Sequence, residues 1–239
     1  MKNIRIVLVR TFHPGNIGSS ARAMKTMGLD QLVLAAPRDY EADVAKQEAR
    51  KMASSAEDLL DQPVITEDVK SAVDDCGLVI ACTARPRSFD LPCLNPDEAA
   101  QKLLEHQQHG PVALMFGPER MGLHNSDIEL AHYRVTIPAN PDYSSLNLAS
   151  AVQILCYELR RHFDSSVAPV TDTVILPDIK HREHFFSGLE ALLYDVGFLK
   201  PQHPGQSMDK LRHLLLRGEP SADELNLLQG VIAALKRKL

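Results

Sequence analysis

The amino-acid sequence predicts an α/β fold in which a mostly parallel sheet carries helices on both faces, with a small helical extension at the C-terminal end. Short apolar runs of strand length alternate with segments of helical periodicity as far as residue 163, which is typical of a parallel sheet with crossover helices. The first run, Ile4–Val9, is continuously apolar, as expected of a strand covered on both faces. With 239 residues, 44% of them hydrophobic, the chain is long enough for one such domain and an appendage.

Six strands are predicted in this domain, and glycine, proline or polar residues bound most of them. The last strand runs into a loop with two prolines, Pro138 and Pro141, each of which fixes φ and keeps the residue before it out of the helical region. The predicted strands are residues 4–9, 31–34, 64–65, 78–82, 112–116 and 133–137.

Five helical segments are predicted between and after the strands, and several have a recognisable start signal. Asn16 caps the first, which ends at Gly28, and Thr66 caps the third. Pro96 stands at the favoured first position of the fourth. The five segments are residues 16–28, parts of 39–60 with a capping signal at Ser54, 67–76, 96–106, and 146–163, for which Ser144 and Ser145 are natural N-caps.

The domain organisation follows from a change of pattern near residue 164. Residues 1–163 form the main domain, residues 164–178 lack periodicity and contain Pro169 and Pro177, and residues 179–239 form a helical extension. Helices are predicted at residues 180–196, 207–217 and 221–238, and Ser221 with Glu224 forms a capping box for the last. Because this tail buries little by itself, we expect it to pack on the first domain or on a second subunit.

Composition and charge limit the possible functions. No apolar run approaches 20 residues and the N-terminus lacks the features of a signal peptide, so we expect a cytoplasmic protein with no membrane segment. The four cysteines have no C-x-x-C spacing, so a zinc site is not expected. The formal net charge is -5, yet residues 1–29 carry five Lys and Arg and no acid. Local charge decides a contact surface, so RNA is not excluded.

The familiar nucleotide-binding signatures are absent from the sequence. No Gly-x-Gly-x-x-Gly follows the first strand and no Gly-Lys-Ser/Thr occurs, so neither a Rossmann dinucleotide site nor a P-loop is predicted. His181-x-x-His184 and His106-x-x-His109 lack the spacing and the companion carboxylate of a zinc protease. We expect these histidines to lie on the surface. No metal is predicted.

Three loops that each follow a strand carry a distinctive set of residues. They are Asn16-x-Gly18-x-x-x-Arg22, Phe116-Gly117-x-Glu119-x-x-Gly122-Leu123, and Ile137-Pro138 leading to Ser144-Ser145-Leu146-Asn147. In this order they resemble the three motifs of the SPOUT RNA 2′-O-methyltransferases, and within that superfamily the TrmJ type of tRNA (cytidine/uridine-2′-O-)-methyltransferase. One motif alone would be explained by turn chemistry, but three in order, each after a strand, favour the family.

The resemblance implies a fold, a reaction and an assembly. It implies that the C-terminal part of the sheet is tied in a trefoil knot, that S-adenosylmethionine is the cofactor, and that the protein is a homodimer whose active site is completed across the interface. The TrmJ type methylates the ribose of nucleotide 32 in the tRNA anticodon loop. Two alternatives remain: an enzyme of the same superfamily acting on another tRNA or rRNA position, and a non-catalytic knotted RNA-binding module.

By position, the resemblance assigns cofactor contacts to loops after three strands. Backbone donors and acceptors beside small residues suit the adenine and methionine parts, and Gly117 lets the main chain approach closely. The expected cofactor-binding residues are Cys82, Thr83, Ala84, Gly117, Ile137, Ser144, Ser145 and Leu146.

Arg22 and Ser145 are the expected catalytic residues. A guanidinium has a pKa above about 12 and no acceptor, so Arg22 is a poor base. We expect it instead to clamp a phosphate and to stabilise the ribose alkoxide. The alternative is an ordinary helix salt bridge, which residues 1–29 do not favour because they contain no acid.

RNA contacts are expected from Arg22, Asn16 and the basic loop with Arg85 and Arg87. The two loop arginines would position RNA through phosphates without reading its sequence, although a solvated basic loop is nearly as consistent with the sequence. Glu119 and Asn147 are expected to support the site, Glu119 by accepting backbone N–H bonds that fix the Gly117 loop or by pairing with Arg120. Tyr143 either stacks on a base or lies at the dimer interface.

Overall fold

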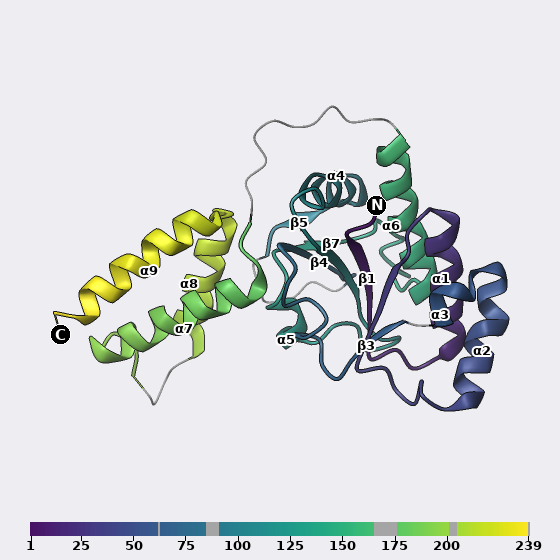
Figure 1. Cartoon of the computed structure of the whole chain (residues 1–239), viewed down its shortest axis with the longest axis horizontal. Helices are drawn as coiled ribbons and strands as arrows, with labels where there is room; N and C mark the ends of the chain where they lie inside the picture. The colour runs from purple at the N-terminus through teal and green to yellow at the C-terminus, as the bar shows by residue number, and fades with distance from the viewer. Residues whose placement is uncertain (62, 85–90, 165–175, 201–204, 239) are drawn as a thin grey trace.

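The computed structural model describes residues 1–61, 63–84, 91–164, 176–200 and 205–238. Its centre is a seven-stranded sheet of order β3-β2-β1-β6-β4-β7-β5 (Figure 1). Every neighbouring pair is parallel, with Ile6 opposite Leu32 on one side and Leu114 on the other. The parallel α/β class is therefore confirmed. The strands are β1 Ile4–Val9, β2 Gln31–Ala35, β3 Val64–Thr66, β4 Leu78–Cys82, β5 Cys93–Leu94, β6 Val112–Phe116 and β7 Tyr133–Val135.

Two separate cores cover the two faces of the sheet. Alternate residues of β1 point to opposite faces: Ile4, Ile6 and Leu8 join the core beneath α1, α4 and α6, whereas Val7 and Val9 join the core on the other face. The second core is closed by the turns of residues 69–76, by α5 and by the first residue of α7. The helices of the domain are α1 Pro14–Thr26, α2 Asp43–Ala53, η1 Ser54–Ala56, α3 Asp58–Asp61, α4 Pro96–His106, α5 Asn125–Ile128 and α6 Leu148–Asp164.

The start signals of two helices were predicted wrongly. α1 begins at Pro14 after His13, and Asn16 lies inside the first turn with its side chain turned to other loops. For α6, the cap is Asn147, whose Oδ1 accepts from the backbone N–H of Ala149 at 2.9 Å. An amide side chain satisfies free N–H groups at a helix start as well as a serine does, so pattern alone does not separate Asn147 from Ser144 and Ser145. The helix start predicted at Pro96 is confirmed, and an Asn95–Glu98 capping box precedes it.

The helix predicted at residues 67–76 is wrong. The backbone there forms successive turns closed by bonds over three residues, such as Val73 N–H to Lys70 O at 3.0 Å. Asp68, and not Thr66, accepts the N–H of Ser71 at 2.7 Å. The apolar spacing that suggested a helix is still used, because Val69, Ala72, Val73 and Cys76 are buried against the sheet. The capping signal at Ser54 is also wrong, because this residue ends α2 with φ +53°. The sequence pattern missed β5 and α5 altogether.

The tail has the three helices that the sequence predicts. They are α7 Ile179–Asp195, α8 Gly205–Arg217 and α9 Ala222–Lys236, and the Ser221–Glu224 capping box is present. The helices enclose a core of their own that includes Phe185, Phe186 and Leu225. The linker predicted at residues 164–178 falls largely outside the described residues.

One buried cation fastens the tail to the sheet domain. Arg182 of α7 is 1% exposed, and its Nη1 lies 2.5 Å from Nε2 of His132, whose Nδ1 lies 3.0 Å from the backbone N of Val79. A neutral imidazole has a single acceptor nitrogen, so the tautomer of His132 decides which of these two contacts is a hydrogen bond. Burial, and then the charge of Arg182, hold the pKa of His132 well below its ordinary value. Nearer the surface, Lys102 pairs with Glu219 at 3.0 Å. The tail therefore packs on the first domain.

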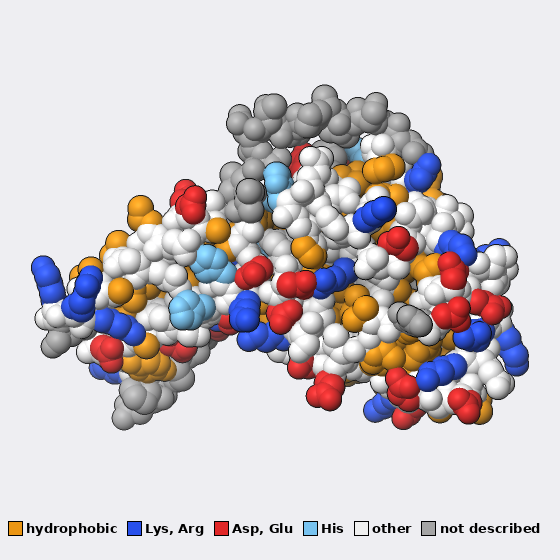
Figure 2. Space-filling view, viewed as in Figure 1, with side chains coloured by type: hydrophobic (Ala, Val, Ile, Leu, Met, Phe, Trp, Pro, Cys, Tyr) orange, Lys and Arg blue, Asp and Glu red, His pale blue; other side chains and the backbone are white. Residues whose placement is uncertain are grey.

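Charges are mixed on the face of the molecule seen in Figure 2, where Lys and Arg side chains are interspersed with Asp and Glu. Surface ion pairs such as Lys25–Asp58 at 2.6 Å account for part of this mixture. Within the described residues, no helix is long and apolar enough to cross a membrane.

Gly18 allows α1 and α2 to touch, and its replacement tests this packing. A Cβ at Gly18 would lie 1.9 Å from the carbonyl oxygen of Ala49 in α2, so Gly18→Ala must force the helices apart. We expect a loss of about 3 kcal/mol of unfolding free energy, seen in thermal denaturation as a Tm lower by about 10 °C. In the control Gly15→Ala, the new Cβ would meet Met52 Cγ at 3.4 Å, so the Tm should not fall. Equal melting of the two variants would contradict the close packing.

Candidate functional site

A cavity opens at the carboxyl ends of β4, β6 and β7, where loops following neighbouring strands converge. In a parallel sheet this edge is the usual place for a ligand. All eight residues predicted to bind the cofactor line this one cavity: Cys82, Thr83, Ala84, Gly117, Ile137, Ser144, Ser145 and Leu146. They come from positions up to 64 residues apart in the chain, so the fold brings together what the three motifs only suggested.

Gly117 forms a wall of the cavity that admits no side chain. A Cβ there would lie 2.2 Å from Leu123 N and 2.4 Å from Gly122 C. The loop from Gly117 folds back on itself through a bond from Gly122 N–H to Pro118 O at 2.9 Å, with φ +67° at Gly122. Leu123 is buried in the core, so this turn has little room to move. Main chain thus faces the cavity directly, as a ligand held by backbone groups requires.

Three side chains tie the loops of the site to one another. Nδ2 of Asn16 donates to Oε1 of Glu119 at 2.5 Å, and Nδ2 of Asn147 donates to Oδ1 of Asn16 at 3.0 Å. Oε2 of Glu119 accepts from the backbone N–H of Phe12 at 3.0 Å. The chain of bonds joins the loops that follow β1, β6 and β7. Glu119 therefore accepts a backbone N–H as expected, and this bond ties the Gly117 loop to the β1–α1 loop.

The Glu119 carboxylate is held in its charged form. Burial acts to raise its pKa, but hydrogen bonds from the Asn16 side chain and the Phe12 N–H outweigh burial and leave the pKa below the ordinary glutamate value. A carboxyl group with a lowered pKa stabilises the structure above its ordinary pKa and loses that contribution as the pH falls through the lowered value. The tie between the loops is therefore complete at neutral pH. Asn16 is occupied by two partners here, and its RNA contact stays a prediction.

The floor of the cavity, formed by Cys82 and Thr83, offers no reactive side chain. Thr83 N–H donates to Val135 O at 3.0 Å, and Thr136 Oγ1 donates to Thr83 O at 2.9 Å, which fixes the end of β4 against β7. Burial raises the pKa of the Cys82 thiol to about 12. The protonated thiol is a poor nucleophile, so Cys82 can serve as a wall and not as a reactive group. The residues of this floor offer backbone atoms and shape.

Arg22 does not line this cavity. It lies on the exposed side of α1, six residues beyond Asn16 and hence about 9 Å further along the helix axis. Among the described residues, its guanidinium has no hydrogen-bond or ion-pair partner, so the salt-bridge alternative is not observed there. Arg85 and Arg87 lie outside the described residues.

The rim of the cavity is open to solvent and partly apolar. Ser144 and Ser145 are exposed, as is Tyr143 beside them with 79% of its surface accessible. Leu146, which lines the cavity, is 41% exposed.

The motifs also missed several residues that line the cavity. Leu148 and Ala151 come from the first turn of α6, and Pro118 and Arg120 from the turn after Gly117. The sequence did contain a signal for Leu148 and Ala151. They are three residues apart at the start of a helix and therefore share one helix face, and the loop before that helix was already assigned to the cavity. Arg120 has φ +70°, which its side chain gave no reason to expect.

Known proteins match both the sheet domain and the tail. Residues 3–157 match the model of the SpoU rRNA Methylase family. The chain belongs to the SpoU methylase family. Residues 180–239 match a second model, described as the C-terminal domain of tRNA methyltransferase TrmJ.

Two relatives of this SpoU methylase are similar to it along nearly their whole length. The chain is 43% identical over 240 residues to the tRNA (cytidine/uridine-2′-O-)-methyltransferase TrmJ of Pectobacterium atrosepticum, covering 99% of this chain and 98% of that protein. The crystal structure of TrmJ from Z. mobilis ZM4 is 36% identical with a TM-score of 0.81, covering 97% and 98%. The SpoU methyltransferase AviRb from Streptomyces viridochromogenes, in complex with AdoMet, has a TM-score of 0.52 over 70% of this chain and 60% of that one. At 24% identity, AviRb shows the fold alone.

Asn16 offers a direct test of the tie between the loops. In Asn16→Ala both side-chain bonds are lost, and the Glu119 carboxylate keeps the Phe12 N–H as a partner. Since bonds to a charged group contribute about 2 kcal/mol, we expect S-adenosylmethionine to bind about 30-fold more weakly by calorimetry. Ser19→Ala, three residues along the same helix, is the matched control and should bind normally. Unchanged binding in Asn16→Ala would show that the loops hold their places without this network.

Proposed function

We propose that this SpoU methylase is an S-adenosylmethionine-dependent tRNA ribose 2′-O-methyltransferase that acts on cytidine or uridine at nucleotide 32 of the anticodon loop. The observation that carries the proposal is the cavity at the carboxyl ends of β4, β6 and β7, in which all eight expected cofactor residues meet. Support for tRNA comes from the whole-length similarity to TrmJ proteins and from the match of the tail to a TrmJ domain. A cytoplasmic location follows from this substrate.

The cavity fits the cofactor on structural grounds. The Gly117 wall, which a Cβ would fill, gives a flat ligand direct access to the backbone. Ile137, Leu146 and Leu148 supply apolar surface, and Ser144 and Ser145 supply hydroxyl groups at the mouth. When bound, S-adenosylmethionine supplies an electrophilic methyl group. The protein's part is to hold the ribose 2′-oxygen in line with that group and to take up its developing negative charge.

Arg22 is the residue proposed to meet the ribose and its phosphate. Its charge stabilises the alkoxide, and its planar fork binds a phosphate with two parallel bonds. Ser145, exposed at the cavity mouth, is proposed to orient the 2′-hydroxyl. Neither group is suited to remove the proton at neutral pH, so the proton passes to a group of the substrate or to water.

A homodimer with a shared active site explains the position of Arg22. Arg22 is exposed on α1 and is not among the residues that line the cavity of its own chain, so we propose that it works at the cavity of the partner. Exposed apolar side chains that suit such an interface lie at the cavity rim and on α6: Tyr143, Leu146 and Tyr157. The trefoil knot is proposed on family grounds for the segment that includes β7 and α6. A monomer at micromolar concentration in sedimentation would refute the shared site.

The reaction is tested with tRNA transcripts that differ at one atom. The purified protein is incubated with tritiated S-adenosylmethionine and a transcript, which is then digested and analysed by nucleoside mass spectrometry. We expect label in nucleotide 32, and none in a transcript that carries a 2′-deoxynucleotide at that position. A 2′-deoxynucleotide at position 34 is the matched control and should not reduce labelling. Label elsewhere would keep the chemistry and refute the position, whereas cofactor binding without label in any RNA would support a binding module.

A further inference from the structure

An exposed aromatic ring with a cation on its face lies in the loop between β1 and α1. The ring of Phe12 is 41% exposed, and Cζ of Arg38 lies 4.4 Å from its centroid. Two other cation–ring pairs occur in the described parts of the chain, and their rings, Tyr133 and Phe186, are 5% and 1% exposed. The Phe12 pair is thus the one of the three that presents its ring to solvent.

Hydrogen bonds fix the backbone of both Phe12 and Arg38. The N–H of Phe12 donates to Oε2 of Glu119 at 3.0 Å, and the N–H of Arg38 donates to the carbonyl oxygen of Thr11 at 3.3 Å. The ring and the guanidinium are therefore held together by the two loops that follow β1 and β2, and not only by their own attraction. A rigid surface of this kind loses little entropy when a flat ligand stacks on it.

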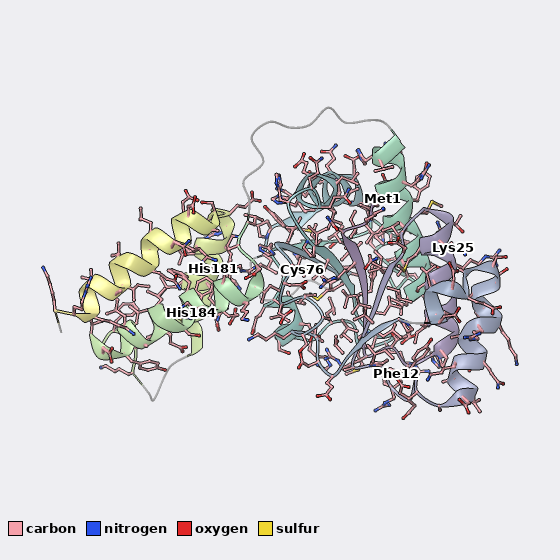
Figure 3. All side chains as sticks on the ribbon, in the orientation of Figure 1. Met1, Phe12, Lys25, Cys76, His181 and His184 are labelled. Carbon is pink, nitrogen blue, oxygen red and sulfur yellow. The ribbon has the colours of Figure 1, made fainter. Side chains whose placement is uncertain are left out.

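The pair lies close to the cavity, and its cation has no acid partner among the described residues. Glu119, which holds the Phe12 backbone, is itself a cavity-lining residue, and Figure 3 shows Phe12 at the end of the sheet to which β1 runs. Within the described residues, Arg38 has no hydrogen-bonded or ion-paired acid, whereas Arg5 pairs with Asp75 at 2.5 Å and Arg10 with Asp127. A cation with no acid partner beside an exposed ring near the cavity suits an anionic, aromatic ligand.

We propose that Phe12 and Arg38 form a stacking site for a nucleobase of the tRNA strand next to the methylated nucleotide. This inference rests on the proposed function and adds a substrate-binding site to it. Unpaired bases of RNA loops are bound by stacking on aromatic rings and guanidinium planes, and the positive charge attracts the neighbouring phosphate. A protein partner is less favoured, because a single ring flanked by charge is much smaller than a typical apolar docking patch.

The steady-state constants of Phe12→Ala test the site. Loss of one base–aromatic stack should raise the KM for tRNA about tenfold, while kcat and the Kd for S-adenosylmethionine stay within about twofold of the parent enzyme. Phe12→Tyr keeps the ring and should behave as the parent does. Phe198→Ala removes another exposed phenylalanine, 63% accessible in the tail, and serves as the matched control with an unchanged KM.

The salt dependence of tRNA binding separates the two members of the pair. Phe12→Ala removes no charge, so the slope of log Kd against log salt should not change, whereas Arg38→Ala should lower the slope by about one. An unchanged KM in Phe12→Ala, or a change in its sedimentation from dimer to monomer, would overturn the stacking site. If the parent enzyme itself transfers no methyl group to tRNA, it is the proposed function that fails.

Discussion

Gly117→Ala is expected to abolish binding of S-adenosylmethionine while the protein remains folded. The new Cβ would overlap the backbone of Gly122 and Leu123 at 2.2 to 2.4 Å, and Leu123 is anchored in the core. The strain is relieved most easily by moving the loop into the open cavity, because the core side resists compression. We expect the Kd, measured by calorimetry, to rise at least about 100-fold, equivalent to about 3 kcal/mol.

The matched control for this substitution is Gly188→Ala in α7, where a Cβ would meet no atom within 4 Å. This variant should bind the cofactor normally. Near-ultraviolet circular dichroism of both variants separates loss of the cavity from loss of the fold. Normal cofactor binding by Gly117→Ala would mean that the cofactor does not use this wall.

Arg22→Ala is expected to abolish methyl transfer without weakening cofactor binding. The side chain is exposed and has no hydrogen-bond or ion-pair partner among the described residues, so its removal should leave the fold intact. Loss of one group that stabilises developing charge typically lowers kcat by about 10³-fold. The measurement is single-turnover transfer to tRNA at saturating cofactor, beside calorimetry with S-adenosylmethionine.

Two variants make the Arg22 experiment specific. Lys25→Ala removes another exposed cation from α1, one that pairs with Asp58, and should keep nearly full activity. Arg22→Lys keeps the charge but loses the planar fork, so it should recover only part of the rate. Full turnover by Arg22→Ala would remove the residue from the mechanism.

The sequence predicted the cavity well because its residues stand directly after strands. Cys82 ends β4, Gly117 and Ile137 follow β6 and β7, and a parallel sheet brings the carboxyl ends of its strands to one edge. The position of Arg22 was harder to judge. Its helix was predicted, but which cavity its side chain would serve in the proposed homodimer depends on assembly, which no local pattern encodes.

Errors arose where different backbone conformations satisfy one pattern. Residues 67–76 bury Val69, Val73 and Cys76 at helical spacing but form successive turns. Apolar spacing indicates which side of a segment is buried, but it does not determine the backbone hydrogen-bond pattern. Asn16 was assigned to a cap because asparagine favours helix starts. The Asn16 side chain instead bonds to Glu119 and Asn147, which are 103 and 131 residues away in the sequence. Contacts over such separations form only in the assembled sheet, so a local pattern does not predict them.

The buried Arg182 makes attachment of the tail a proton-linked equilibrium. Docking places His132 where burial and the guanidinium hold its pKa well below the ordinary value, so the docked form keeps this imidazole neutral. A separated tail would remove the Arg182 guanidinium from His132, so the imidazole would take up a proton more readily than in the docked form. Protonation of His132 in mild acid therefore favours release of the tail, and neutral or alkaline solution favours the docked tail.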